Sequence, residues 1–450
     1  MSRRLSLAAL ATAAVTLPFN AGVTAAHAAV VTSSAPSPIT VRMAIVSNGQ
    51  MLDMEHWTPL VFEKEHPNIH VLFDTLGEDN ERPLIEKDIT THAGLFDGIM
   101  ISNYETPWFA KNGWLTDLSP DAKATPGYDA SDFLPPIAES LSYDGQLYGV
   151  PFYGESSFLI YRKDLFAKAG LTMPLHPTWG QVASFAAKLT NRSAGIAGIC
   201  LRGAPGWGMN LAPLDTVVNT FGGVWFNMKW QPQLTSPPFE SAVTFYVNLL
   251  RKYGEPSAAN ATFDDILNEY NAGKCAMWYD ATSLADLLTP AMLAKSGFVW
   301  APVDKTKYSG WLYTWSLSIP SDISEAEKAA TWEFISWATS KQYDNFIAQK
   351  EGWIKVPPGS RTSVYENPAF KRAVPFGAIT LQSIDAANPV HPSTQPQPYM
   401  GVQFVGIPEF ESLGDAVSRQ ISGAIAGTET VQQALATSQS LALAATSSYR

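Results

Sequence analysis

Short apolar segments alternate with segments whose apolar residues recur at helical spacing, and this alternation constrains the fold more than any other feature of the chain. Apolar segments at 39–46, 69–73 and 96–101 are separated by helical patterns at 53–65 and before His92. This order is typical of a parallel sheet covered by helices, because each parallel connection must cross the sheet. The carboxyl ends of the strands then meet at one edge, where α/β folds place their ligand clefts.

The same pattern recurs along the rest of the chain. Further strands are expected at 146–151, 158–161, 274–279 and 298–302. Capping boxes predict two helix starts and glycines two helix ends, at Thr178 with Gln181, Ser324 with Glu327, Gly254 and Gly427. About 420 residues follow the first 28, too many for one core, so we expect two α/β lobes joined by more than one crossing of the chain.

The first 28 residues have the pattern of a secretory signal. Arg3 and Arg4 precede an apolar run at 5–17, and 26–28 form a small-x-small cleavage site. An uncleaved membrane anchor is the alternative, although the run is short for a span. We expect cleavage after Ala28, by either the general or the twin-arginine route. No cysteine follows the run, so no lipid anchor is expected, and 29–39 is predicted to be a flexible leader.

The composition limits the classes of molecule that the protein is expected to bind. A formal net charge of −11 argues against nucleic acid and against an anionic membrane surface. No long apolar run follows the signal, so the mature protein is expected to be soluble. The chain has 14 tryptophans, which are common in sugar-binding clefts but more often pack in cores.

The two cysteines, Cys200 and Cys275, are predicted to form a disulfide in an exported chain. Two separately buried thiols are the alternative. Neither cysteine has a partner at metal-ligand spacing, so no metal is expected.

Catalytic motifs are missing from the sequence. It contains no GxSxG elbow, HExxH, P-loop or GxGxxG. A glycosidase would need two carboxylates across the bond that it cleaves. Candidates are Glu78, Glu105, Glu155 and Asp280, but on sequence alone an ordinary surface or salt-bridged acid is the favoured interpretation of each of them. We therefore predict no enzymatic activity and no cofactor.

Several stretches carry a resemblance to a known family. Residues 143–157 are YDGQLYGVPFYGESS and 161–166 are YRKDLF; further pieces are GICLRG at 198–203, NTFGG at 219–223, GKCAMW at 273–278 and GVQFV at 401–405. Together they resemble the extracellular solute-binding proteins of carbohydrate ABC importers, and within them the branch that binds sugar alcohols such as sorbitol and mannitol. The resemblance covers nearly all of the chain after Thr40.

The resemblance implies a periplasmic-binding-protein-like fold, with a ligand cleft between two α/β lobes and several hinge crossings. Lobe 1 would contain 40–151 and 309–351, and lobe 2 would contain 152–308 and 352–450. The chain would then be a periplasmic monomer that delivers its ligand to permease subunits with their ATPase.

A sugar alcohol has a hydroxyl on every carbon, so its site needs charged acceptors, bidentate donors and aromatic faces. The expected ligand-binding residues are Asn48, Glu78, Tyr104, Glu155, Arg202, Trp225, Asp280, Trp311, Trp315 and Gln403. Glu155 matches a sugar-contacting acid of the wider class. Arg202 could instead form a structural ion pair, and each tryptophan could instead pack in a core.

Three hypotheses follow. The first is a polyol receptor of an importer. The second is a secreted carbohydrate-active enzyme, and the third is a receptor for another monosaccharide, an oligosaccharide or a sugar phosphate.

Overall fold

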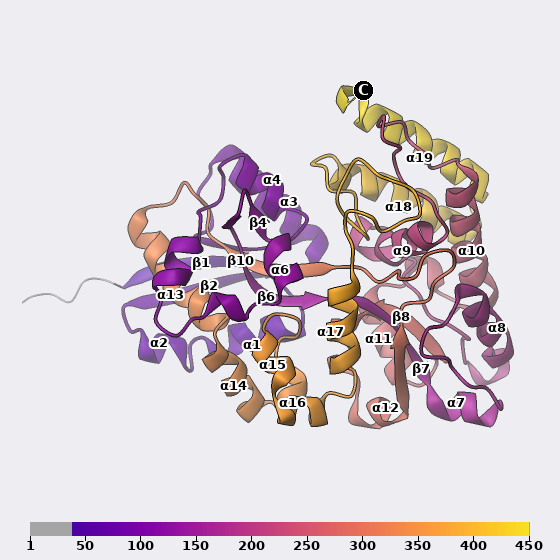
Figure 1. Cartoon of the computed structure of the whole chain (residues 1–450), viewed down its shortest axis with the longest axis horizontal. Helices are drawn as coiled ribbons and strands as arrows, with labels where there is room; N and C mark the ends of the chain where they lie inside the picture. Colours follow the sequence, from indigo (N-terminus) through magenta and orange to yellow (C-terminus); the bar gives the residue numbers. More distant parts are fainter. Residues whose placement is uncertain (1–37, 450) are drawn as a thin grey trace, which may run out of the picture. The chain divides into compact units, whose positions relative to one another are not determined.

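A computed structural model describes residues 38–449, so the predicted signal and most of the predicted leader lie outside the described residues. Two sheets organise the described chain (Figure 1). The strands of the first sheet, in spatial order, are β2 (Ile69–Leu76), β1 (Ile39–Val46), β3 (Gly98–Ser102), β10 (Tyr313–Ser318) and β6 (Val150–Glu155). Those of the second are β8 (Met277–Ala281), β7 (Ser157–Arg162) and β9 (Ser296–Trp300).

The first sheet matches the expected parallel arrangement in its N-terminal part only. Strand β1 pairs in parallel with β2 and β3, whereas β10 is antiparallel to both β3 and β6. In the second sheet β7 is antiparallel to β8 and to β9, so the parallel pairing of the N-terminal strands does not recur there. Strand β6 leads almost directly into β7, and the two sheets are therefore linked by a strand rather than by a helical crossover.

Helices cover both sheets. Before β6 come α1 (Gly49–Trp57), α2 (Phe62–Glu65), α3 (Glu78–Thr91), α4 (Thr106–Lys111), α5 (Ser119–Ala124), α6 (Pro135–Ser140) and the hairpin of β4 (Ser142–Tyr143) and β5 (Gln146–Leu147). Between β7 and β10 come α7 (Lys163–Lys168), α8 (Trp179–Leu189), a π-helix (Trp207–Leu211), α9 (Ala212–Thr220), α10 (Pro237–Tyr253), α11 (Phe263–Asn271) and α12 (Pro290–Lys295). After β10 come α13 (Glu325–Ala338), α14 (Lys341–Lys350), α15 (Thr362–Glu366), α16 (Pro368–Ala373), α17 (Gly377–Ala386), α18 (Phe410–Ala426) and α19 (Val431–Ala445).

Local signals placed several helix ends correctly. Both predicted capping boxes form, at the starts of α8 and α13. Helix α10 ends before Gly254, and α18 ends at Gly427 with the left-handed backbone (φ 79°) that glycine adopts without strain. The predicted helix 53–65 is instead two helices, α1 and α2, because the backbone leaves helical geometry at Val61 (φ −126°).

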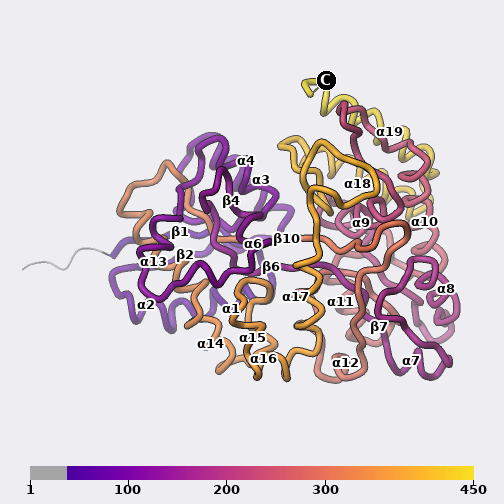
Figure 2. Tube along the Cα trace, viewed as in Figure 1, coloured from indigo at the N-terminus to yellow at the C-terminus, as the bar shows by residue number. Residues whose placement is uncertain are grey.

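The chain passes between the two sheets at paired strands and again near α17. Strands β6 and β10 lie side by side; β6 leads toward the second sheet and the antiparallel β10 leads back from it (Figure 1). Helix α17 contacts β6 of the first sheet and β7 and β9 of the second. Figure 2 shows α17 beside the part of the trace where β6 leads toward β7. The exact lobe boundaries stay a prediction.

The predicted disulfide between Cys200 and Cys275 is confirmed, with a Cα–Cα distance of 5.9 Å. It joins the segment after α8 to β8, beside short parallel bridges at Ala197–Cys275 and Cys200–Trp278. Among residues 38–449 no helix is both long enough and apolar enough to cross a bilayer.

Candidate functional site

A cavity with about 730 Å³ of open space is lined by residues from the ends of strands in both sheets. This volume is in the range of small-molecule sites, which are about 300–1,000 Å³. Seven of the ten predicted site residues line it, namely Asn48, Glu78, Glu155, Arg202, Trp311, Trp315 and Gln403. Asn48, Glu78 and Glu155 follow or end a strand, which is why an order of strands could point to these three.

The other three predicted residues are placed elsewhere. The Tyr104 hydroxyl donates to the Ile407 carbonyl (2.9 Å), and its ring packs against Trp207 and Phe404. Trp225 is buried, and its indole N–H donates to Asp215 (2.9 Å). Both therefore pack in the core instead of facing the cavity.

Asp280 was expected at the mouth of a strand ending at Tyr279, and that prediction was wrong. Strand β8 continues to Ala281, so Asp280 lies inside it. Side chains alternate between the two faces of a strand. Ala281 lines the cavity, and Asp280 points to the opposite side, where it is fully buried.

The buried Asp280 holds Arg202 in place at the cavity wall. Nε of Arg202 donates to both carboxylate oxygens (3.0 and 3.1 Å), and a terminal nitrogen also donates to Oδ1. Trp278 and the backbone N–H of Ala281 complete the shell of donors around Asp280. Arg202 is thus both the ion-pair residue and the cavity residue that the sequence left as alternatives. The disulfide at Cys200, two residues before it, ties this segment to β8.

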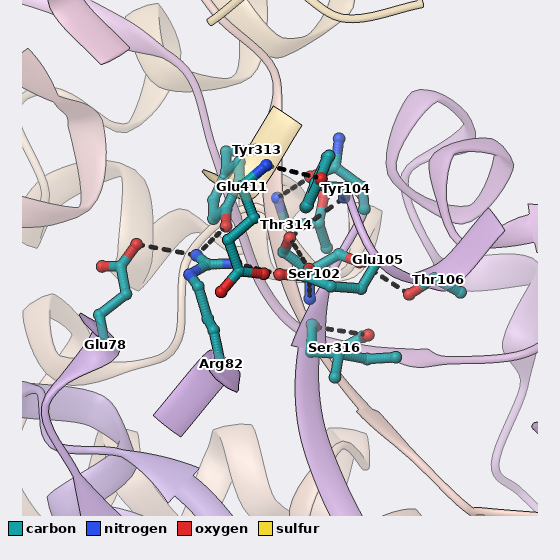
Figure 3. Close-up of polar contacts among 12 residues, drawn as sticks. Glu78, Arg82, Ser102, Tyr104, Glu105, Thr106, Tyr313, Thr314, Ser316 and Glu411 are labelled. Carbon is teal, nitrogen blue, oxygen red and sulfur yellow. Dashed lines mark hydrogen bonds and ion pairs between the residues drawn. The ribbon is translucent and has the colours of Figure 1, made fainter. Parts of the chain in front are cut away.

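Glu78 is held by a second ion pair, with Arg82 (Figure 3). In this pair the acid lines the cavity and the base does not, which is the reverse of the Arg202–Asp280 pair. Glu78 lies in the first turn of α3 and accepts from Arg82 at 2.8 Å, one turn later. Arg82 does not line the cavity; it also donates to Glu105 and to the Tyr313 hydroxyl. Glu105 in turn accepts from Ser102, so its orientation is set by the end of β3.

Glu155 lies at the end of β6, and no arginine among residues 38–449 forms an ion pair with it. The Ser283 hydroxyl donates to its carboxyl group. Burial raises the pKa of Glu155 to about 8, although the Ser283 hydrogen bond and the charge of Arg202 act in the opposite direction. Glu155 is therefore largely protonated at neutral pH and can donate as well as accept.

Three residues that line this cavity have a buried polar atom without a partner in the described part of the chain. Within residues 38–449 no hydrogen-bond partner is present for Oε1 of Gln403, Nε1 of Trp311 or Oδ1 of Asn48. All three residues line the cavity. An unpaired buried polar atom is costly, so these atoms are suited to a hydroxylated ligand or to water.

Several lining residues were not predicted. They are Gln50, Tyr153, Trp207, Phe263, Asp264, Ser283 and Tyr313. A signal existed for two of them, because Tyr153 is two residues from Glu155 on β6 and Tyr313 lies between Trp311 and Trp315 at strand spacing. For Trp207 the only hint was a glycine-rich segment, which folds as a π-helix. Such helices are frequent at functional sites.

The described residues, 38–449, contain no group of three or more His, Cys, Asp or Glu side chains that could hold a metal ion.

Comparison with known proteins places the chain in a family. The pattern of the bacterial extracellular solute-binding proteins matches residues 48–345. The chain belongs to this family. A mannitol-binding protein of Pseudomonas aeruginosa is 41% identical to this solute-binding protein over 405 residues, covering 89% of this chain and 91% of the relative.

Solved structures agree with the fold of this solute-binding protein. An ABC transporter solute-binding protein of Agrobacterium vitis with bound D-mannitol has a TM-score of 0.87 and 45% identity, covering 90% of this chain and 97% of its own. A solute-binding protein of Agrobacterium radiobacter in complex with ribitol has a TM-score of 0.79 and 24% identity, covering 90% and 98%. The predicted two-lobed α/β fold and the family resemblance are therefore confirmed.

Proposed function

We propose that this solute-binding protein captures an open-chain sugar alcohol, a hexitol such as mannitol, and delivers it to an ABC importer. The observation that carries the proposal is the excess of hydrogen-bond acceptors in the cavity. The Glu78 carboxylate lines it, together with the unpaired amide oxygens of Gln403 and Asn48, and the neutral carboxyl group of Glu155 adds both an acceptor and a donor. Arg202 and the Trp311 N–H are the corresponding donors.

This distribution favours an alditol over a cyclic sugar. Every oxygen of an alditol is a hydroxyl and can donate, whereas ring and glycosidic oxygens can only accept. The charges favour a neutral ligand over a phosphate, because Arg202 is already neutralised by Asp280 and Arg82 by Glu105 and Glu78. Aromatic rings at Trp207, Trp311, Trp315 and Tyr313 offer faces for the C–H edges of the ligand.

The biological setting of the proposal follows from the family and the N-terminal sequence. We expect export through the segment 1–28, cleavage after Ala28 and a periplasmic monomer that turns over no substrate. Permease subunits with their ATPase are the expected partners. Lobes 40–151 plus 309–351 and 152–308 plus 352–450 would close on the ligand by a rigid-body motion. The names of the mannitol-binding relatives support this ligand class.

Thermal unfolding in the presence of candidate ligands tests the proposal. At 100 times Kd a ligand stabilises the folded state by about 2.7 kcal/mol. We expect mannitol or sorbitol to raise the Tm, ribitol to raise it less, and maltose and glycerol 3-phosphate to leave it unchanged. A shift with maltose but with no hexitol would overturn the polyol assignment. Release of products from oligosaccharides by the purified protein would instead support the enzyme hypothesis.

A further inference from the structure

Arg82 is buried behind the cavity, where it touches aromatic rings from both halves of the molecule. Its side chain is 4% exposed. The guanidinium carbon lies 4.4 Å from the ring centroid of Trp207 and 4.7 Å from that of Trp315. Trp315 belongs to β10 of the first sheet, whereas Trp207 belongs to the π-helix between β7 and β10. Both tryptophans line the cavity, and Arg82 does not.

The same guanidinium orients an acid of the cavity. Arg82 donates to Glu78 at 2.8 Å and also to Glu105 and the Tyr313 hydroxyl, and Figure 3 shows it between the two acids. The Glu78 carboxylate also contacts the π-helix, because a Cβ added at Gly208 would lie only 2.6 Å from Oε1 of Glu78. Two cavity-lining tryptophans and one cavity-lining carboxylate thus share one hidden partner.

We propose that Arg82 is a positioning residue for ligand capture: it couples Trp207 to Trp315 and fixes Glu78, and it thereby sets the affinity of the cavity. The inference rests on the proposed polyol-binding function and adds a residue that does not touch the ligand. The two tryptophan rings need a cation stacked on their faces, whereas the carboxylates need hydrogen-bond donors in the plane of the cation. The flat guanidinium provides all of them at once, because it stacks on rings while donating in its plane.

Lysine at this position would keep the charge but lose the planar fork. We expect Arg82→Lys to weaken mannitol binding about tenfold in calorimetry, the loss of roughly one desolvated cation–π contact. The matched control is Arg162→Lys. Arg162 is 8% exposed and paired with Asp164, and it does not line the cavity. The control variant should bind mannitol as the wild type does.

A double-mutant cycle separates positioning from general stability. Trp207→Leu alone should weaken binding, and Arg82→Lys combined with Trp207→Leu should weaken it by less than the product of the two single effects. The Tm of the ligand-free variants is measured in parallel, because a merely structural Arg82 would lower this Tm without any coupling in affinity.

Glu105→Gln provides a second variant in case Arg82→Lys does not fold. It removes the anchoring charge of Arg82 and changes no residue of the cavity lining. We expect weaker mannitol binding by several-fold. Equal affinity in Arg82→Lys and Arg162→Lys, multiplicative effects in the cycle, or unchanged affinity in folded Glu105→Gln would each overturn the inference. A wild-type protein that binds neither mannitol nor sorbitol would overturn the proposed function, and this inference with it.

Discussion

Two guanidinium–carboxylate pairs border the cavity, and they are arranged in opposite senses. In one, Arg202 lines the cavity and Asp280 is hidden behind it with 0% of its side chain exposed. In the other, Glu78 lines the cavity and Arg82 is hidden. Each hidden partner neutralises a buried charge and fixes its orientation. The cavity is therefore given a donor at one place and an acceptor at the other; Arg202 and Asp280 neutralise each other, whereas Glu78 shares Arg82 with Glu105.

Glu155 shows what happens without such a partner. It is buried near Arg202, but that guanidinium is already bound to Asp280. Its pKa consequently rises to about 8, mainly through burial. A carboxyl group in this environment is neutral over much of the physiological range, and the protein obtains a switchable donor from the same residue type that serves as an acceptor at Glu78.

Replacing Asp280, the buried residue of the Arg202–Asp280 pair, should have the largest effect on stability. Asp280→Asn leaves the guanidinium of Arg202 buried without a counter-charge, which costs about 3–5 kcal/mol of unfolding free energy. Denaturant titration measures this loss. Asp164→Asn is the control, because Asp164 is 41% exposed and its pair with Arg162 should contribute no more than about 1 kcal/mol. Equal losses in the two variants would contradict the structural role of Asp280.

The pH dependence of stability should reveal the unpartnered Glu155. Between its ordinary pKa of 4.5 and its raised pKa of about 8, the folded protein holds a proton that the unfolded chain releases. Stability therefore falls as the pH rises through this window, by at most about 1.4 kcal/mol per pH unit, and levels off above it. Glu155→Gln should become progressively more stable than the wild type from pH 4.5 to 8.

Thermal unfolding of the ligand-free proteins at several pH values measures the difference. Asp344→Asn is the matched control, since burial raises the pKa of Asp344 to about 7 but the residue does not line the cavity. Asp344→Asn should change the pH dependence of the stability in the same direction as Glu155→Gln does. It should leave mannitol affinity unchanged, whereas Glu155→Gln should weaken mannitol binding. Parallel pH profiles for Glu155→Gln and the wild type would contradict the raised pKa.

Neutralising Glu78, the residue of the Glu78–Arg82 pair that lines the cavity, should reduce ligand affinity more than it reduces the stability of the fold. In Glu78→Gln the charged acceptor is lost, while Arg82 keeps Glu105 as its counter-charge. We expect about tenfold weaker mannitol binding, equivalent to about 1.4 kcal/mol, with a smaller change in unfolding free energy. Calorimetry gives the affinity. Glu86→Gln, on the same helix but outside the cavity lining, should bind as the wild type does.

The smallest effect should come from a tryptophan that the sequence could not distinguish from its neighbours. Trp225→Phe changes a residue outside the cavity, so mannitol affinity should stay within about twofold of the wild type. Trp315→Phe removes part of the cavity wall and the contact with Arg82, and it should weaken binding more. Equal affinities in the two variants would remove Trp315 from the site.

Much of the fold was readable from local sequence. The capping boxes that start α8 and α13 and the glycine that ends α18 are decided by interactions within a few residues. The first strand was placed at its exact bounds because its apolar run is uninterrupted except at Arg42. The polar residues that follow strand ends, Asn48 and Glu78, were found for the same reason.

By itself the sequence determined several strands and helices, the two-lobed class and four of the nine acids and aromatics that line the cavity, namely Glu78, Glu155, Trp311 and Trp315. Only the tertiary structure decided which member of each ion pair faces the cavity. Strand β8 runs two residues past its expected end at Tyr279, and Asp280 therefore points away from the cavity, because strand side chains alternate. Arg82 was not among the residues predicted from the sequence, because its partners Glu105 and Tyr313 lie 23 and 231 residues away along the chain. The role of a guanidinium depends on the residues that pack against it. A local sequence pattern does not predict contacts between residues that are so far apart in the chain.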